Sequence, residues 1–531
     1  MRFSRQLLIL ARRGVLSPGR PDRLVRQVAS ILAWGAGIAG EIRQAAARSP
    51  DAIAVVDEER GEITYAALLA SCERSARVLL GEGLSARDRV GLLCRNHLGL
   101  VELLGGASMA GIDVVLLGTG LAAAQVTEVV EREGISLVVH DDEFGELIDG
   151  VRVPRLGEQA FLALLAAGAG GGRLRPPARV GRVVVLTSGT TGQPKGARRP
   201  HPRSLSSLAS VLDRIPLRPR EAVLLSAPIF HTWGFGALQL ALAMRDTIVL
   251  QRRFDPGAAL AALDEHRCHV VFAVPVMLQR LLGHVGEVGR DAPEGAAPCL
   301  RIAAVSGSSL PPGLASRFMA SFGPVLYNVY GSTEVSWAAI ADPDDLRAAP
   351  SCSGRPPHGT RVVILGDDGS ELPAGQVGRV LVGNEMLFSG YTDGAGRERW
   401  RGLVDTGDLG HLENGRLHLD GRGDDLVVSG GENVYPVELE AAIGGLPEVH
   451  DVSVFGVPDD EFGQRLVACV VPQPGASLAP ERVIERVRPL VSRQALPRAV
   501  HIVDELPRNA TGKVLVGELR AAYLQDPDPP A

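Results

Sequence analysis

The sequence predicts an α/β protein of more than one domain, with parallel sheets in most of the chain. From about residue 50 to residue 310, short β-branched runs alternate with alanine-rich, helix-period stretches, which is typical of strands buried on both faces. The chain has 531 residues, and single cores rarely exceed about 250 to 300 residues. Past residue 350, glycine-punctuated runs predict hairpins of a small β-barrel, and a small α+β unit follows from about residue 425.

The first part of the chain is expected to hold nine buried strands. Each is a short apolar run followed by a turn or by a helical segment such as GLVELLGGASMAG (99–111). The expected strands are 52–57, 89–94, 113–118, 136–141, 182–188, 222–228, 246–251, 269–275 and 301–307.

The last third of the chain follows a different pattern. Hairpins are expected within 360–383 and 415–431, where glycine and aspartate interrupt the apolar runs. The final unit is expected to contain a helix at 436–446, strands at 449–458 and 466–472, and a helix near 480–491.

The first 45 residues form a basic N-terminal extension, because eight arginines stand there against Asp22 and Glu41. Its longest apolar run, 28–40, is shorter than the roughly 20 residues needed to span a bilayer. Two interpretations stay open: an amphipathic helix pair lying on a membrane surface, or helices packed on the body. A cleaved signal peptide is disfavoured, because arginines interrupt the apolar stretch.

Composition and charge exclude several classes of partner. The net charge of −6 comes from interspersed signs, and no aromatic-basic stripe indicates nucleic-acid binding. The six cysteines are scattered singly, without metal-ligand spacing, which is typical of reduced thiols in a cytoplasmic protein. We therefore expect small-molecule substrates.

A loop rich in glycine and hydroxyl groups, TSGTTGQPKG (187–196), follows an apolar strand. Glycines let backbone N–H groups close on an anion, and hydroxyls with one ammonium add donors, so the loop predicts a phosphate site. It is not a Walker A loop, because Gln193 and Pro194 precede the lysine. The predicted phosphate-binding residues are Thr187, Ser188, Gly189, Thr190, Thr191, Gly192 and Lys195.

Lysine occurs only twice among 55 basic residues, at Lys195 and Lys513. An ammonium is a compact point charge on a flexible stem, whereas guanidinium is planar and prefers bidentate partners. We infer that these two positions need an ammonium that can follow charge on phosphate oxygens.

Further polar stretches follow in chain order. Glu334, within LYNVYGSTEV (326–335), offers the carboxylate oxygen that commonly holds Mg²⁺ beside phosphates. Asp408 lies in a tight turn, where a carboxylate can accept both hydroxyls of a ribose. A glycine-rich charged joint carries Arg422, and the polar loop LPRNATGKV ends near Lys513.

A competing fingerprint lies in GAGIAG, where Gly35, Gly37 and Gly40 fit G-x-G-x-x-G and Asp57 follows at dinucleotide-binding spacing. The residues before Gly35 are not β-branched, which disfavours the required strand. A nicotinamide-dependent oxidoreductase remains as the alternative from another class.

Taken together, these stretches resemble adenylate-forming enzymes of the AMP-binding superfamily, of the fatty acyl-CoA synthetase type. The resemblance covers about residues 45–520. It implies a basic extension at 1–45 and a large adenylation domain at 46–423, with two layered α/β subdomains and a small β-barrel. A small mobile α+β domain at 424–531 would then follow a hinge at Asp424.

The resemblance also implies the roles of single residues. Lys513, Lys195, Thr333 and Glu334 would act in catalysis, and Glu334 would hold Mg²⁺. Ser308 stands where glycine is commoner in the adenine-side loop. The residues implied to bind nucleotide or coenzyme A, besides the phosphate loop, are Gly307, Ser308, Tyr330, Gly331, Ser332, Thr333, Asp408, Arg422, Gly430 and Gly431.

The acid site is expected around His231, Trp233 and Gly234. Relatives that activate amino acids carry an aspartate where His231 stands, and a neutral imidazole gives an ammonium no partner. The resemblance therefore implies activation of a medium- or long-chain fatty acid with ATP, Mg²⁺ and coenzyme A. Loading of a carrier protein and a catalytically silent binding protein stay open as alternatives, and a homodimer is a further expectation.

Overall fold

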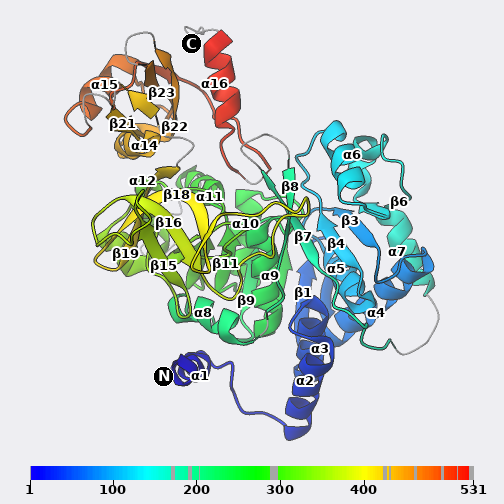
Figure 1. Ribbon diagram of the computed structural model, residues 1–531. Helices are drawn as coiled ribbons and strands as arrows, with labels where there is room; N and C mark the ends of the chain where they lie inside the picture. The colour runs from blue at the N-terminus through cyan, green and yellow to red at the C-terminus, as the bar shows by residue number, and fades with distance from the viewer. Residues whose placement is uncertain are drawn as a thin grey trace.

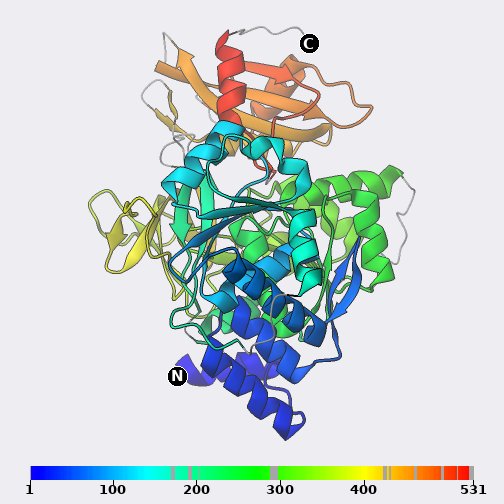
Figure 2. The same ribbon diagram turned by 90° about the vertical axis from the view of Figure 1, so that its right-hand side faces the viewer.

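The computed structural model describes residues 2–168, 174–188, 194–202, 204–287, 297–422, 427–429, 432–459, 463–491, 495–510 and 512–525. A large body of α/β sheets carries a smaller unit at one end, formed by the C-terminal part of the chain (Figure 1). Figure 2 shows the same separation from the side, with the N-terminal helices at the end of the body opposite the C-terminal unit. The predicted fold class, a large mixed α/β domain followed by a smaller domain, is confirmed.

The larger sheet of the body has eight strands and is parallel except at its two edge strands. Its strands are apolar runs buried on both faces, which is why the sequence shows little alternation there. In spatial order they are β14 (Ala339–Ala341), β13 (Leu326–Tyr330), β12 (Ile302–Val305), β11 (Val270–Ala273), β9 (Ala222–Leu225), β10 (Thr247–Leu250), β1 (Ile53–Asp57) and β2 (Gly61–Thr64).

A second sheet of six strands is parallel except for its last strand. Buried residues of the two sheets, such as Val55 and Val90, belong to one hydrophobic cluster, so the sheets share a core. The order is β6 (Arg155–Gly157), β5 (Leu137–His140), β3 (Arg89–Leu93), β4 (Asp113–Leu116), β7 (Val183–Ser188) and β8 (Pro194–Arg198). All nine predicted strands are confirmed.

Helices connect and cover these strands. The predicted helix at 99–111 is confirmed as α5 (Leu98–Ala110), whose residues are almost all buried, so it lacks a polar face. The other helices of the body are α4 (Tyr65–Gly81), α6 (Ala123–Arg132), α7 (Glu158–Ala167), α8 (Ser206–Arg214), α9 (Thr232–Met244), α10 (Pro256–Glu265), α11 (Pro275–Glu287), α12 (Pro312–Phe322) and α13 (Pro343–Ala348), with 3-10 turns η1 (Asp142–Phe144) and η2 (Glu146–Ile148).

A five-stranded antiparallel sheet stands where the barrel was predicted. Its strands are β15 (Arg361–Leu365), β16 (Gly378–Gly383), β17 (Arg399–Trp400), β18 (Leu403–Glu413) and β19 (Arg416–Arg422). The hairpin within 360–383 is confirmed, but the one within 415–431 is wrong: β19 pairs with β18, and the residues from 427 join the C-terminal sheet. Among the described strands no pairing closes this sheet into a barrel.

The C-terminal unit has its own hydrophobic core, built around residues such as Leu439 and Leu466. The predicted helices and strands of this unit are all present. Its elements are β20 (Val427–Ser429), β21 (Glu432–Val434), α14 (Pro436–Gly444), β22 (Val449–Asp459), β23 (Gly463–Pro472), α15 (Pro480–Val487), β24 (Ala499–Ile502) and α16 (Val516–Gln525).

The N-terminal extension folds into α1 (Arg2–Arg12) and α2 (Pro21–Trp34), and α3 (Ile38–Arg48) follows. α1 packs against α8 and buries Leu10 completely in the main core. α2 instead leaves Val25 and Leu32 largely exposed. Of the helices that the structure describes, none is both long and apolar enough to cross a bilayer.

The dinucleotide fingerprint has no strand before it. Gly35 caps the C-terminus of α2 with φ 77°, so GAGIAG joins two helices. Asp57 accepts hydrogen bonds from the backbone N–H groups of Leu98 at 2.8 Å and Arg60 at 3.0 Å, which occupy its carboxylate. The strand-turn-helix context that a nicotinamide site requires is therefore absent from this segment.

Candidate active site

A cavity of about 2110 Å³ lies where the two large sheets, the five-stranded sheet and the C-terminal unit meet. Fourteen of the predicted site residues line it, although they come from distant parts of the chain. They are Thr187, Lys195, His231, Trp233, Gly307, Ser308, Tyr330, Gly331, Ser332, Thr333, Glu334, Asp408, Arg422 and Lys513.

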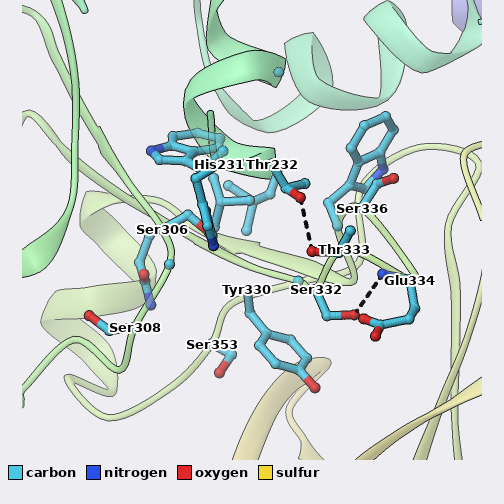
Figure 3. Close-up of a pocket in the computed structure, with 18 of the residues that line it drawn as sticks. His231, Thr232, Ser306, Ser308, Tyr330, Ser332, Thr333, Glu334, Ser336 and Ser353 are labelled. Atoms are coloured by element: carbon cyan, nitrogen blue, oxygen red, sulfur yellow. Dashed lines mark hydrogen bonds between the residues drawn. The ribbon is translucent and has the colours of Figure 1, made fainter. Parts of the chain in front are cut away.

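Two hydroxyl groups meet at the centre of the cavity. Thr232 opens helix α9, Thr333 follows strand β13, and their Oγ1 atoms share a hydrogen bond at 2.9 Å (Figure 3). The turn before Thr333 needs a glycine, because a Cβ on Gly331 would lie 2.1 Å from the carbonyl oxygen of Ser336. The sheet end thus presents hydroxyl groups to the cavity.

Glu334 is a buried carboxylate, 7% exposed, on the wall of this space. The hydroxyl group of Tyr391 donates to its Oε1 at 2.5 Å, and burial together with Glu334 raises the pKa of Tyr391 to about 12. Arg199, also buried, donates to the carbonyl oxygen of Thr333 at 3.4 Å. Burial lowers the pKa of Arg199 to about 10, so it remains a cation at neutral pH.

Tyr330 and Asp408 are held together by a hydrogen bond from the phenol to the carboxylate at 2.5 Å. Burial and the carboxylate raise the pKa of Tyr330 well above its usual value, so its proton stays in place. Asp408 lies opposite Arg422 in the register of strands β18 and β19. These three residues, all predicted to bind nucleotide, therefore form one group.

Both lysines line the same cavity. Lys195 lies on β8 opposite Thr187, and its Nζ atom is 5.9 Å from the ring centre of Tyr391. Lys513 comes from the C-terminal unit, at the end of a turn in which its N–H group donates to Oδ1 of Asn509 at 2.9 Å.

The turn that carries Lys513 fits closely between the two parts of the body. A Cβ on Gly512 would lie 2.5 Å from Cγ1 of Val276, and a Cβ on Gly120 would lie 2.9 Å from Cβ of Ala510. Glycine at these two contacts lets the turn approach α11 and the loop after β4. This fit places the ammonium of Lys513 at the cavity.

His231 lies directly before α9 and faces the cavity. Burial lowers its pKa to about 4, with further lowering by the charges of Lys513 and Arg199. The imidazole is therefore neutral at pH 7 and offers a bound acid no charge.

A family model described as AMP-binding enzyme matches residues 42–392, about two thirds of the chain. The chain belongs to the AMP-binding enzyme family. A second model, the AMP-binding enzyme C-terminal domain, matches residues 438–513 and includes Lys513. The superfamily that the motifs resemble is thereby confirmed.

The relatives of this AMP-binding enzyme differ in the acid that their names state. It is 31% identical over 502 residues to a long-chain-fatty-acid–CoA ligase of Mycobacterium tuberculosis, covering 91% of this chain and 97% of that one. It is 30% identical over 475 residues to a feruloyl-CoA synthase of Amycolatopsis, covering 87% and 94%. At the level of the family these comparisons support ATP-dependent acid–CoA ligase activity, without selecting the acid.

Solved structures of similar fold include ATP-bound MatB from Rhodopseudomonas palustris. The two chains are 27% identical with a TM-score of 0.82, and the match covers 92% of this chain and 99% of MatB. A fatty acyl CoA synthetase from Mycobacterium tuberculosis is 29% identical with a TM-score of 0.71, covering 92% and 98%.

Some predicted residues of this AMP-binding enzyme lie elsewhere. Gly234 is buried and is not among the residues that line the cavity, and a Cβ there would come within 2.1 Å of the carbonyl oxygen of Pro228, so close packing requires a glycine. Outside the described residues lie the predicted Gly189, Thr190, Thr191, Gly192, Asp424, Gly430 and Gly431, together with the side chain of Ser188.

Sequence reasoning missed Tyr391 and Arg397, which both line the cavity next to Glu334. Neither lies in a patterned motif, and the bond between Tyr391 and Glu334 joins positions 57 residues apart. It also missed that α2 reaches the cavity wall through residues such as Leu24 and Ile31.

Among the residues that the structure describes, one cluster of side chains that could hold a metal ion lies outside the cavity, at Cys94, His97 and Asp141. The Nδ1 atom of His97 accepts from the backbone of Gly99 at 3.1 Å and thereby caps α5. Its Nε2 atom lies 2.8 Å from Oδ1 of Asp141. Because both ring nitrogens are engaged, this cluster anchors a helix.

Glu41 is partly buried and lines the same cavity from α3, and burial raises its pKa from 4.5 to about 8. Because the folded protein holds this proton up to a higher pH than the unfolded chain does, proton binding to the group contributes stability in full below pH 4.5. This contribution is lost as the pH rises through 8. We expect Glu41→Gln to match the wild type at pH 4.5 and to exceed its free energy of unfolding at pH 9 by about 2 kcal/mol, since cavity water reduces the full effect. Urea unfolding at the two pH values measures this, and an equal difference at both would contradict it.

Proposed function

We propose that this enzyme activates a medium- or long-chain fatty acid in two steps. In the first step a carboxylate oxygen attacks the α-phosphorus of ATP, forming an acyl-adenylate and releasing pyrophosphate. In the second step the thiol of coenzyme A displaces AMP and leaves the acyl group as a thioester. The observation that carries this proposal is a single cavity with two lysines and hydroxyl groups at one end and an apolar extension beyond them.

The nucleotide would lie between the group formed by Tyr330, Asp408 and Arg422 and the side of the cavity that carries Lys195. We propose that Tyr330 stacks near adenine beside Gly307 and Ser308, that Asp408 accepts from the ribose hydroxyls, and that Arg422 assists there. Thr333 would donate to the α-phosphate beside Gly331 and Ser332. The phosphate loop from Thr187 through Ser188, Gly189, Thr190, Thr191 and Gly192 to Lys195 would hold the β- and γ-phosphates.

The residues around Glu334 fit a magnesium ion, because carboxylate and phosphate oxygens are the ligands that Mg²⁺ prefers. A bound Mg²⁺ would neutralise charge on the phosphate oxygens. Tyr391 fixes the carboxylate by its hydrogen bond to one oxygen, which orients Glu334 toward the cavity.

Lys513 and Lys195 would stabilise the transition state, in which negative charge gathers on the oxygens around the α-phosphorus. Because Lys513 arrives with the C-terminal unit, movement of that unit would withdraw it after the first step. The proposed hinge is Asp424, and Gly430 and Gly431 would border the path of coenzyme A.

An apolar acid is favoured by the surroundings of His231 and Trp233. The imidazole is neutral, and the indole N–H of Trp233 donates to the carbonyl oxygen of Ala273 at 2.9 Å, so neither offers a charge to a substrate. An amino acid would leave its ammonium without a partner here.

The deciding experiment offers a panel of fatty, aromatic and amino acids with ATP, Mg²⁺ and either coenzyme A or an acyl carrier protein, and records AMP release. We expect fatty acids with coenzyme A to react fastest. A preference for the carrier protein would favour the alternative, since one relative is a fatty acid–acyl-carrier-protein ligase of Streptomyces coeruleorubidus. Preference for aromatic acids would overturn the proposed substrate class.

We also propose that the extension, residues 1–45, contacts a membrane surface. Exposed apolar side chains on α1 and α2, namely Leu7, Leu8 and Leu32, lie beside arginines that would face anionic headgroups. Sedimentation with anionic vesicles tests this, and a chain that stays in the supernatant contradicts it. A homodimer remains a prediction.

A further inference from the structure

Beyond Trp233 the cavity follows helix α9 toward the N-terminal end of the body. Gly236, Gln239, Leu240 and Ala243 line it from α9, at the i, i+3, i+4 and i+7 spacing of one helix face. A further part of the wall comes from α8, where Leu208 and Val211 line the same space.

Helix α2 supplies the far wall. Leu24, Gln27, Val28 and Ile31 line the cavity, and they repeat the spacing of a single helix face. This face of α2 borders open space, whereas its neighbouring face packs on α3. The linker between α1 and α2 adds Leu16 to the same wall.

Two contacts fix α2 in this position. The side-chain amide of Gln27 donates to Oε1 of Gln44 on α3 at 2.6 Å. The guanidinium of Arg43 lies 3.8 Å from the ring centre of Trp34, at the last turn of α2. The wall is therefore held by specific contacts with α3.

The length of this part of the cavity suits an extended acyl chain. From Thr232 to Ala243 helix α9 rises by about 16 Å, at 1.5 Å per residue. An extended carbon chain advances a little less than one bond length of about 1.5 Å per atom, so roughly a dozen carbons span that distance. An acid activated beside Thr232 would place its tail end at α2.

We propose that α2 and the linker before it form the distal end of the acid site and set the longest acyl chain that the enzyme accepts. This inference rests on the proposed function. The segment lies before residue 42, where the match to the AMP-binding enzyme model begins, so it is an addition to the part of the chain that the family model describes.

The test narrows the distal end with Ile31→Trp and measures kcat/KM for a series of acids from hexanoate to hexadecanoate. The wider side chain should lower kcat/KM for the longest acids at least tenfold and leave hexanoate within about twofold, because each methylene excluded from an apolar wall loses about a factor of four. Val25→Trp is the matched control, since Val25 is on α2 but 69% exposed and away from the cavity. Val25→Trp should change kcat/KM neither for hexanoate nor for hexadecanoate.

A second variant places a side chain nearer the reaction centre. A Cβ on Gly236 would meet no atom within 4 Å, and Gly236 lines the cavity, so the side chain of Gly236→Leu starts in open space. The longest acid that Gly236→Leu accepts should be shorter than the longest acid that Ile31→Trp accepts, because Gly236 lies nearer Thr232 along the cavity. Thermal unfolding of each variant, with and without hexadecanoate, separates loss of binding from loss of folding.

Failure of the proposed function and failure of the role of α2 give different results. If the wild type activates no carboxylic acid, the proposed function itself fails. If it activates long acids but Ile31→Trp slows hexanoate and hexadecanoate equally, or Val25→Trp has the same effect, the assignment of α2 is overturned. A reversed order of chain-length limits between Gly236→Leu and Ile31→Trp would overturn it as well.

Discussion

Replacing Lys513 with alanine is expected to slow acyl-adenylate formation by about 100- to 1,000-fold, the usual effect of removing one transition-state donor. Lys513 is more than one third exposed and its backbone makes the turn contacts, so the melting temperature should hardly change. Lys513→Arg should be nearly as slow, because a planar guanidinium cannot reproduce the point contact of an ammonium.

Two measurements separate this effect from damage to the fold. ATP/pyrophosphate exchange reports the first step, and thioester formation from synthetic acyl-adenylate reports the second, which Lys513 variants should largely retain. Arg482→Ala, at an exposed position of α15 outside the cavity, is the matched control and should leave both rates unchanged. Near-normal exchange in Lys513→Arg would refute the assignment.

Glu334→Gln should slow adenylation roughly 100-fold, which equals about 2.7 kcal/mol of barrier. The amide has nearly the same shape but lacks the negative charge that would hold a divalent cation beside the phosphates. The concentration of Mg²⁺ that gives half the maximal rate should rise in this variant.

Tyr391→Phe is the control for Glu334. It removes only the phenol that donates to Oε1 and keeps the carboxylate, so a loss of about tenfold or less is expected. If Tyr391→Phe were as slow as Glu334→Gln, the role of Glu334 would lie in its hydrogen bonds. Unchanged Mg²⁺ dependence in Glu334→Gln would contradict the proposed ion site.

Much of the fold follows from local pattern. Strands such as β3 and β11 are short continuous apolar runs bounded by turns, which is the pattern of a strand buried on both faces. The prediction within 415–431 was wrong because a hairpin and a chain crossing between two sheets look alike over fifteen residues or so.

The sequence by itself determined the nine buried strands of the body, the separate C-terminal unit and the two lysines that a chain rich in arginine retains. These features depend on residue type and on spacing along the chain. They also sufficed to indicate the family.

Only the tertiary structure decided which distant residues meet. The bond between Tyr391 and Glu334, the position of Lys513 beside His231, and the wall that α2 adds to the cavity all join segments far apart in the chain. Such contacts depend on how the elements pack, because packing joins positions between which the sequence carries no periodic signal.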